Sequence, residues 1–408
     1  MDAERGEKES QHSQSDANGG ITFAKACFNL LNVLSGIGIV AVSYAVSETG
    51  WMSLLLLILV AIVACYTASL LIRCMQTDPK IRAYPEIANL AFGRKGKIFV
   101  SVALCLSMYM IAVEQLIIEG DNLEKMFPNM SLRLGGFKIE GRKAFVFISS
   151  SIILPTVWLR GLGPLAYVSA CGVLAPILIV GSVVWVGLFD GVAFHPSKRL
   201  FSYKGLPTTA SIFAFCLSGH GVLPTITSSM KDRSKAMKMI IVCFATAALT
   251  YSIMAVSGYL MYGQNVKSQI TLNLPKGKIS SKIAIYTIIT IPIVKYAIVV
   301  TPIVVAVEDA VPICKRIVMS LLFRTMLVAS TVIVALTVPF FGYLVALGGS
   351  ALNSTLNFLL PCLFYLKITK NSKHGKVEMG IIVGIMIMSS IIAVLGTYTS
   401  MKRILQHL

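Results

Sequence analysis

The sequence predicts an all-α integral membrane protein of about eleven transmembrane helices, arranged as two five-helix repeats of opposite orientation. Three observations lead to this prediction. First, 56% of the 408 residues are hydrophobic and only 13% are charged, whereas about a quarter of the residues are charged in an average soluble domain. Second, charge-free runs long enough to cross the hydrocarbon core recur along the chain. Third, a Ser-Gly-X-Gly tetrad occurs in the first and again in the sixth of these runs.

The charge-free runs delimit the predicted spans. A formal charge interrupts two of them, Glu114 in the third and Lys295 in the eighth. The run 325–366 is too long for one helix, and we expect two helices that turn near residues 340–343. The predicted spans are therefore 26–47, 51–72, 98–118, 144–159, 164–189, 208–230, 239–262, 283–307, two helices within 325–366, and 379–401.

The spans divide the chain into four parts. Residues 1–20 are polar and contain no aromatic residue, which predicts a disordered cytosolic tail. Residues 21–188 and 205–366 would form the two repeats, and residues 379–401 an additional eleventh helix. Lys and Arg are more frequent in the loops on the side of the N-terminus, which predicts a cytosolic N-terminus and a lumenal C-terminus.

The composition also excludes several classes of function. The formal net charge is +18, but the basic residues lie in short loops between apolar runs, so we assign them to topology and lipid head groups rather than to nucleic acid. Nearly all of the nine Cys lie inside apolar runs or on the side of the N-terminus, which predicts packing residues rather than disulfides. The sequence has no nucleotide-binding loop, metal-ligand spacing or catalytic triad. We therefore expect no enzyme, no cofactor and no metal site.

The two tetrads, SGIG at residues 35–38 and SGHG at residues 218–221, occupy matching places in the two predicted repeats. Gly costs about 1 kcal/mol in a helix interior, and Pro224 follows the second tetrad closely, so both helices are expected to break. Interrupted helices at matching places in inverted halves are typical of the binding site of a secondary transporter. Free N–H groups attract a carboxylate and free carbonyls attract an ammonium, which suits a zwitterionic amino acid. The alternative is that the glycines only allow close helix packing.

At this point the sequence resembles the amino acid/auxin permease family, also called the amino acid transporter transmembrane family, and within it the vacuolar amino acid transporters of plants and fungi. The resemblance covers roughly residues 20 to 400. The matching stretches are NVLSGIGIVAVSY at 32–44, EQLIIEGDNL at 114–123, FCLSGHGVLPTITSSM at 215–230, YAIVVTPIVVAVE at 296–308 and PCLFYLKI at 361–368. Many members have Pro before the Tyr-Ala of the first span, where this chain has Ser43, so the exact break in that helix is left open.

The resemblance implies the five-plus-five inverted-repeat fold of the amino acid–polyamine transporters, with discontinuous helices one and six. It also implies a coupling-ion region where the first span meets the eighth, at Asn32 and Thr301. Vacuolar relatives resemble proton-coupled transporters, so no sodium site is expected. The resemblance implies that substrate is held by the backbone at Ser35, Gly36, Ile37, Gly38, Ser218, Gly219, His220 and Gly221.

Five further side chains are candidates for the site. His220 titrates near neutral pH and is a candidate proton carrier, with capping of the broken backbone as the alternative. Glu114 and Lys295 are costly inside spans unless they face a cavity or a partner, so they are candidates for gate and proton relay, singly or as a pair. The alternatives are that Glu114 reaches the interface and that Lys295 snorkels. Tyr109 and Phe215 are candidates to line the side-chain pocket, with helix packing as the alternative.

These observations favour a secondary active transporter that moves amino acids across an endomembrane, as a symporter or antiporter driven by the proton gradient. Its partners would be the amino acid, protons and the lipid bilayer. The alternative is a non-transporting amino acid sensor of the same fold. Some sensors of this kind use long cytosolic tails, and the tail of about 20 residues favours transport.

Overall fold

The computed structural model describes residues 20–407, apart from 79, 135–136, 160–164, 193, 195–197 and 371–374. The predicted disordered tail, except for Gly20, lies outside the described residues. The α-helices are α2 (Phe23–Leu34), α3 (Val42–Thr49), α4 (Ser53–Thr77), α5 (Tyr84–Met126), α6 (Gly141–Trp158), α7 (Leu165–Phe189), α8 (Leu206–Cys216), α9 (Leu223–Ser229), α10 (Ala236–Tyr262), α11 (Ile279–Ala310), α12 (Ile317–Thr337), α13 (Phe341–Leu347), α14 (Leu360–Ile368), α15 (Lys376–Ile391) and α16 (Thr397–His407).

Shorter elements complete the chain. Three π-helical stretches continue α13 or α15, and one antiparallel hairpin, in which Ser131 lies opposite Glu140, joins α5 to α6. The π-helices are η7 (Gly348–Asn353), η8 (Thr355–Leu359) and η9 (Ile392–Gly396), and the strands are β1 (Ser131–Leu134) and β2 (Phe137–Glu140). The 3₁₀ turns are η1 (Ile37–Val40), η2 (Tyr203–Gly205), η3 (Arg233–Lys235), η4 (Gly263–Asn265), η5 (Ile270–Leu272) and η6 (Pro312–Lys315).

Seven helical stretches within the described residues are long and apolar enough to cross a membrane. They are Ser53–Thr77, Tyr84–Met126, Arg233–Asn265, Ile279–Ala310, Ile317–Thr337, Phe341–Ile368 and Lys376–Gln406. The other four predicted spans correspond to α2 with α3, α6, α7, and α8 with α9. Of these elements, α2, α3, α8 and α9 are each too short to cross a membrane alone, whereas α7 has 25 residues. The count of eleven crossings therefore stays a prediction.

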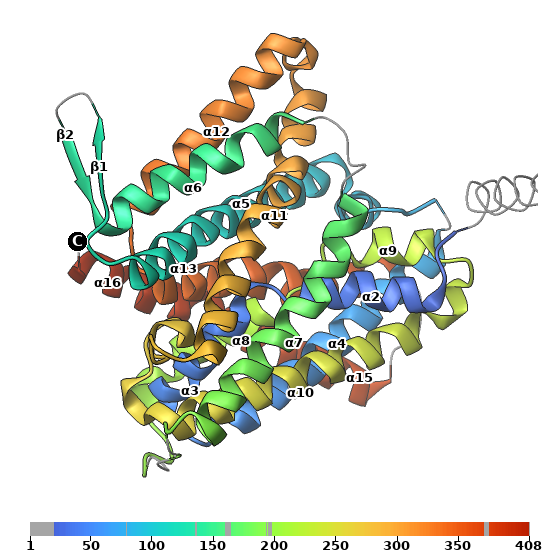
Figure 1. The fold of residues 1–408 in the computed structure, drawn as a ribbon. Helices are drawn as coiled ribbons and strands as arrows, with labels where there is room; N and C mark the ends of the chain where they lie inside the picture. Colours follow the sequence, from blue (N-terminus) through green and yellow to red (C-terminus); the bar gives the residue numbers. More distant parts are fainter. Residues whose placement is uncertain are drawn as a thin grey trace, which may run out of the picture.

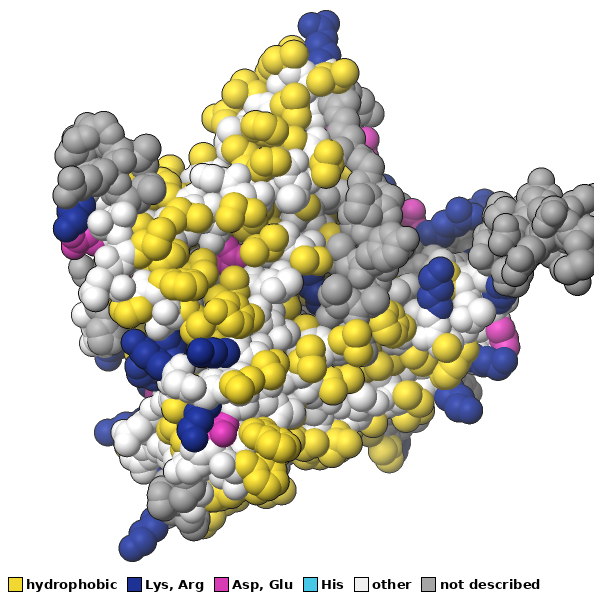
Figure 2. Space-filling model, in the orientation of Figure 1, with side chains coloured by type: hydrophobic (Ala, Val, Ile, Leu, Met, Phe, Trp, Pro, Cys, Tyr) yellow, Lys and Arg dark blue, Asp and Glu magenta, His cyan; other side chains and the backbone are white. Residues whose placement is uncertain are grey.

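The outer surface of the helix bundle is apolar. Hydrophobic side chains cover much of the face in Figure 2, and Lys and Arg gather toward its edges. Large aliphatic side chains point outward from several helices, among them Leu55 on α4, Leu249 on α10 and Ile333 on α12, each more than 60% exposed. Exposed apolar surface of this extent fits a lipid environment. The structure thus supports the predicted multi-pass membrane protein.

The predicted end of the third span at residue 118 is wrong. The helix α5 continues to Met126, so that Glu119 and Asn122 are fully buried instead of lying in a loop. The Asn122 amide donates to the Ile118 carbonyl (2.8 Å) and to the side-chain oxygen of Gln269 (2.7 Å). Gln269, in the segment between α10 and α11, thus provides a hydrogen-bond partner for a polar residue in this part of the helix. A count of charges along the chain cannot detect such a distant partner.

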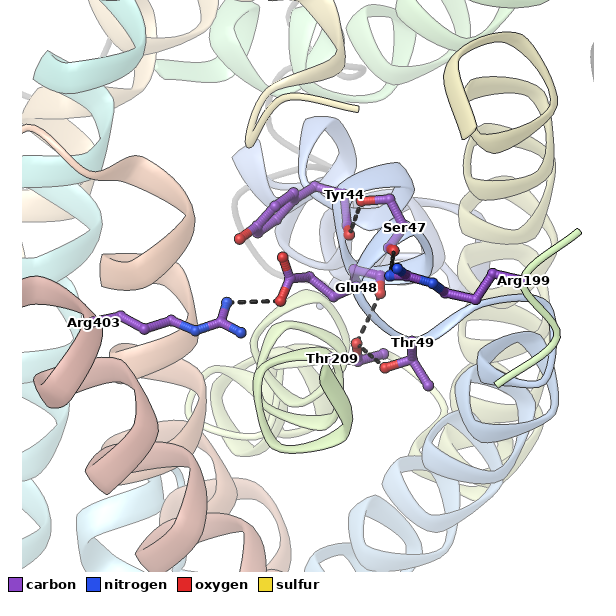
Figure 3. Close-up of polar contacts among 8 residues, drawn as sticks. Tyr44, Ser47, Glu48, Thr49, Arg199, Thr209 and Arg403 are labelled. Carbon is purple, nitrogen blue, oxygen red and sulfur yellow. Dashed lines mark hydrogen bonds and ion pairs between the residues drawn. The ribbon is translucent and has the colours of Figure 1, made fainter. Parts of the chain in front are cut away.

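The interrupted first and sixth spans are joined to each other at both ends. At one end, Ile21 forms a parallel backbone bridge with Met230, in which the Ile21 N–H donates to the Ser229 carbonyl (2.7 Å) and the Lys231 N–H to the Ile21 carbonyl (3.0 Å). At the other end, the Thr49 and Thr209 hydroxyls lie 2.7 Å apart, and the Thr209 hydroxyl donates to the Ala45 carbonyl (2.7 Å; Figure 3). Thus α2 is linked to α9, and α3 to α8.

The last helix is anchored to the first span. Arg403 of α16 forms an ion pair with Glu48 near the end of α3, at 2.7 Å (Figure 3). Its guanidinium also lies over the Tyr343 ring, 5.6 Å from the centroid. Nearby, an Arg199 guanidinium nitrogen lies 3.5 Å from the Ser47 carbonyl. The helix α2 begins at one end of the molecule and α16 finishes at the opposite end (Figure 1).

We expect Glu48→Gln to lower stability modestly, because Arg403 then loses its charged partner while it stays in contact with Tyr343. Both side chains are about a quarter exposed, so the loss should be about 1 kcal/mol or less. Thermal unfolding of the purified protein in detergent measures it. Lys402→Gln, which removes an exposed charge on the same helix, is the control. The exchange of both charges, E48R with R403E, should recover stability. Equal unfolding temperatures for E48Q and wild type would contradict the ion pair.

Candidate functional site

A cavity of about 260 Å³ lies where the interrupted first and sixth spans meet α5, α10 and α11. Most of its wall is apolar, and its polar side chains come from α2, α5, α10, α11 and the break between α8 and α9. The lining residues are Asn32, Val33, Leu34, Gly36, Ile37, Gly38, Met108, Ile111, Gln115, Phe215, Cys216, Ser218, Val222, Tyr251, Ile291, Lys295, Ile298, Val299 and Pro302. Both tetrads therefore contribute to one cavity, as the sequence-based hypothesis requires.

The backbone at both tetrads leaves the α-helical conformation. The helix α2 ends at Leu34, Gly36 is extended (φ −77°, ψ −170°), and α3 begins only at Val42. In the sixth span α8 ends at Cys216 and α9 begins at Leu223. The main-chain N–H groups of Gly36, Gly38 and Gly219 donate to no carbonyl in the described part of the chain. Each break thus leaves free donors at membrane depth, which is tolerated only beside a polar cavity or a ligand.

The two breaks lie in direct contact. The Cys216 thiol donates to the Gly38 carbonyl (3.4 Å), and a Cβ atom on Gly38 would lie 2.8 Å from the Cys216 sulfur and 3.2 Å from the Phe215 ring. Gly38 is therefore required for this close approach. Gly36 differs, because a Cβ atom there would meet only the Val33 carbonyl, at 3.7 Å.

The predicted coupling-ion region is only partly assembled. The Lys295 ammonium of α11 donates to the Asn32 carbonyl (3.2 Å), and both residues line the cavity. The side-chain oxygen of Asn32 is buried and has no hydrogen-bond partner among the described residues. Thr301 donates to the Ala297 carbonyl of its own helix (2.6 Å) and does not line the cavity. The first and eighth spans thus meet at Asn32, through Lys295.

Two other predicted site residues, His220 and Tyr109, point away from the cavity. The His220 Nε2 atom contacts the Thr67 hydroxyl (2.9 Å) and the Ala64 carbonyl (3.1 Å), both on α4. The Tyr109 hydroxyl donates to Ser330 on α12 (3.2 Å). His220 therefore holds the break of the sixth span against α4, and Tyr109 contributes to the packing of α5 against α12.

Glu114 is fully buried and so does not reach the interface. Neither carboxyl oxygen has a hydrogen-bond partner among the described residues, and the pair with Lys295 that the sequence left open is not formed. A Cβ atom on Gly348 would lie 3.7 Å from one of these oxygens, which places the carboxyl beside η7. Of the remaining candidates, Phe215 and Ser218 line the cavity, whereas Ser35, Gly219 and Gly221 do not.

Met108, Ile111, Gln115 and Tyr251 are among the cavity residues that the sequence reasoning missed. Met108 and Ile111 carry no local signal, because apolar residues are expected throughout a span. Tyr251 lies near the middle of a charge-free run, and a buried phenol there must find a hydrogen-bond partner. That requirement is the signal that would have identified Tyr251.

Comparisons with known proteins show the family to which the chain belongs. The family model described as transmembrane amino acid transporter protein matches residues 19–402. The chain is 44% identical over 401 residues to the Arabidopsis thaliana amino acid transporter AVT1I, covering 98% of this chain and 99% of that protein. It is 26% identical over 375 residues to the rat vesicular inhibitory amino acid transporter, covering 85% and 70%.

Among solved structures, the crystal structure of MhsT in complex with L-phenylalanine is similar, with a TM-score of 0.55 at 15% identity, covering 94% of this chain and 99% of that one. This likeness shows the fold alone. The fold and the two interrupted spans around one cavity therefore define a transporter-like membrane protein. The chain belongs to the transmembrane amino acid transporter family.

We expect Gly36→Ala and Gly38→Ala to separate ligand binding from packing. The added methyl at Gly36 meets no protein atom closer than 3.7 Å, so the fold should tolerate it while the methyl occupies the cavity wall. Amino acid transport per folded molecule should fall at least about tenfold, equivalent to about 1.4 kcal/mol. At Gly38 the methyl meets the Cys216 sulfur at 2.8 Å, and overpacking should destabilise the protein by about 1–3 kcal/mol.

Thermal unfolding and uptake per folded molecule are measured for both variants. Wild-type specific activity in G36A, with lowered abundance, would favour the packing interpretation of the first tetrad.

Proposed function

We propose that this protein is a secondary active transporter that moves amino acids across an endomembrane, most specifically the vacuolar membrane, by alternating access coupled to the proton gradient. Membership of the transmembrane amino acid transporter family supports the transported class. The name of the rat relative refers to vesicles, which supports an endomembrane. The relatives are named as transporters, which favours transport over the sensor alternative.

The observation that carries the proposal is the cavity shared by the two interrupted spans. Free N–H groups at Gly36 and Gly38, which line the cavity, are suited to a carboxylate. The carbonyl ends of α2 and α8 attract an ammonium. The apolar remainder of the wall accommodates a side chain. Together these groups match a zwitterionic α-amino acid.

The same breaks support two inverted five-helix repeats at residues 21–188 and 205–366. The tetrads face each other across one cavity, and the likeness to MhsT extends over 94% of the chain. An odd number of crossings would place the two ends of the chain on opposite sides of the membrane. The opposite positions of the start of α2 and the end of α16 support a cytosolic N-terminus and a lumenal C-terminus (Figure 1).

We assign proton coupling to Glu114 and Lys295 rather than to His220. Glu114 is a fully buried carboxyl without a hydrogen-bond partner among the described residues, and Lys295 reaches the cavity at Asn32. Ionisable groups inside spans mark proton and ion pathways. His220 is held against α4 through Nε2, which leaves it a structural role in this arrangement.

Uptake of a panel of labelled amino acids into proteoliposomes with an imposed pH gradient tests the proposal. We expect uptake that follows the gradient, that collapses with a proton ionophore and that does not need sodium. In Glu114→Gln the carboxyl can no longer exchange a proton, so gradient-driven uptake should be lost while amino acid exchange at equal pH persists.

Glu140→Gln, on the exposed hairpin, is the matched control and should transport as the wild type does. Uptake that needs sodium and ignores the ionophore would overturn proton coupling. The absence of any amino acid uptake by the wild type would overturn the proposed function itself.

A further inference from the structure

The hydroxyl of Tyr251 connects the two interrupted helices at the cavity. Tyr251 lies in the middle of α10, is 1% exposed, and contributes to the cavity wall. Its hydroxyl donates to the carbonyl of Leu34, the last residue of α2, and lies 3.0 Å from the carbonyl of Cys216, the last residue of α8. One side chain thus reaches the carbonyl ends of both half-helices.

The hydroxyl cannot satisfy both carbonyls at once. A phenol carries one proton, so it donates to one carbonyl and leaves the other as a free acceptor. Both Leu34 and Cys216 also line the cavity. The carbonyl ends of two helices carry partial negative charge and repel each other at close range, and the shared proton offsets this repulsion. The second carbonyl then needs a donor from elsewhere.

We propose that Tyr251 is the positioning residue for the amino group of the transported substrate. Its proton holds the ends of α2 and α8 together, and the carbonyl that it leaves free accepts a hydrogen bond from the substrate ammonium. This inference rests on the proposed function. It assigns the positioning of the carbonyls that accept from the amino group to α10, a helix outside the two tetrads.

Two further hydrogen bonds support this arrangement. The Cys216 thiol donates to the Gly38 carbonyl (3.4 Å), and Lys295 donates to the Asn32 carbonyl (3.2 Å). Side-chain donors therefore already reach two neighbouring carbonyls of the first break, those of Gly38 and Asn32. The carbonyl pair at Leu34 and Cys216, with a single proton between them, is where an ammonium finds an acceptor.

Tyr251→Phe tests the proposal, because it removes the proton and keeps the ring. We compare KM and kcat for an apolar amino acid, together with the inhibition constant of the carboxylic acid that has the same side chain but no amino group. The variant should raise KM at least tenfold and leave kcat within about twofold. Inhibition by the des-amino acid should be unchanged, since that compound does not use the carbonyls.

Tyr262→Phe is the matched control, because Tyr262 ends the same helix and its buried hydroxyl has no hydrogen-bond partner among the described residues. Y262F should keep KM, kcat and the inhibition constant of the des-amino acid within twofold of wild type. Unchanged KM in Y251F, or an equal loss for the amino acid and the des-amino acid, would overturn the positioning role.

A second variant covers the case in which Y251F does not fold. Tyr251→His retains a ring N–H donor, and a KM within about threefold of wild type supports the requirement for a donor. A tenfold rise in KM with an equal rise in the des-amino inhibition constant overturns it. Wild-type protein without uptake refutes the proposed function, whereas wild-type uptake with an unaffected Y251F refutes this inference alone.

Discussion

The backbone of a membrane-embedded helix must satisfy its own N–H and C=O groups, and the arrangement of this protein follows from the two places where it does not. At residues 35–38 and 218–221 the α-helical ladder stops, so polar backbone is released inside an apolar bundle. Side-chain donors from α8, α10 and α11 reach the released carbonyls at Gly38, Leu34 and Asn32. Among the described residues, the N–H groups of Gly36 and Gly38 receive no such partners, and both glycines line the cavity.

The half-helices are interrupted in the middle and joined to each other at their outer ends. A backbone bridge links α2 with α9 near Ile21, and hydroxyl contacts at Thr49 and Thr209 link α3 with α8. The ion pair of Glu48 with Arg403 attaches the last helix to the same end of α3. The two linked pairs meet at the breaks, where the helical hydrogen-bond ladder of both spans is interrupted. This property supports alternating access as the proposed mechanism.

The sequence predicted the general form of the site better than its individual members. Both tetrads, Asn32, Phe215 and Lys295 line or border one cavity, because Gly, Pro and a charge within an apolar run are local signals. The sequence did not predict that His220 and Tyr109 face α4 and α12. It also ended the third span too early, since Asn122 is stabilised by Gln269, a residue distant in the chain. The direction in which a side chain points depends on how its helix is rotated against its neighbours.

The sequence by itself determined that the chain lies in a membrane and that its first and sixth spans are weak as continuous helices. Apolar run length and the backbone preferences of Gly and Pro are properties of short segments, so they are readable without a fold. Only the tertiary structure decided which donors meet the broken backbone. The contacts of Tyr251 with Leu34 and Cys216, and of Lys295 with Asn32, join helices far apart in sequence. They depend on helix crossing and rotation, which packing of the whole bundle determines.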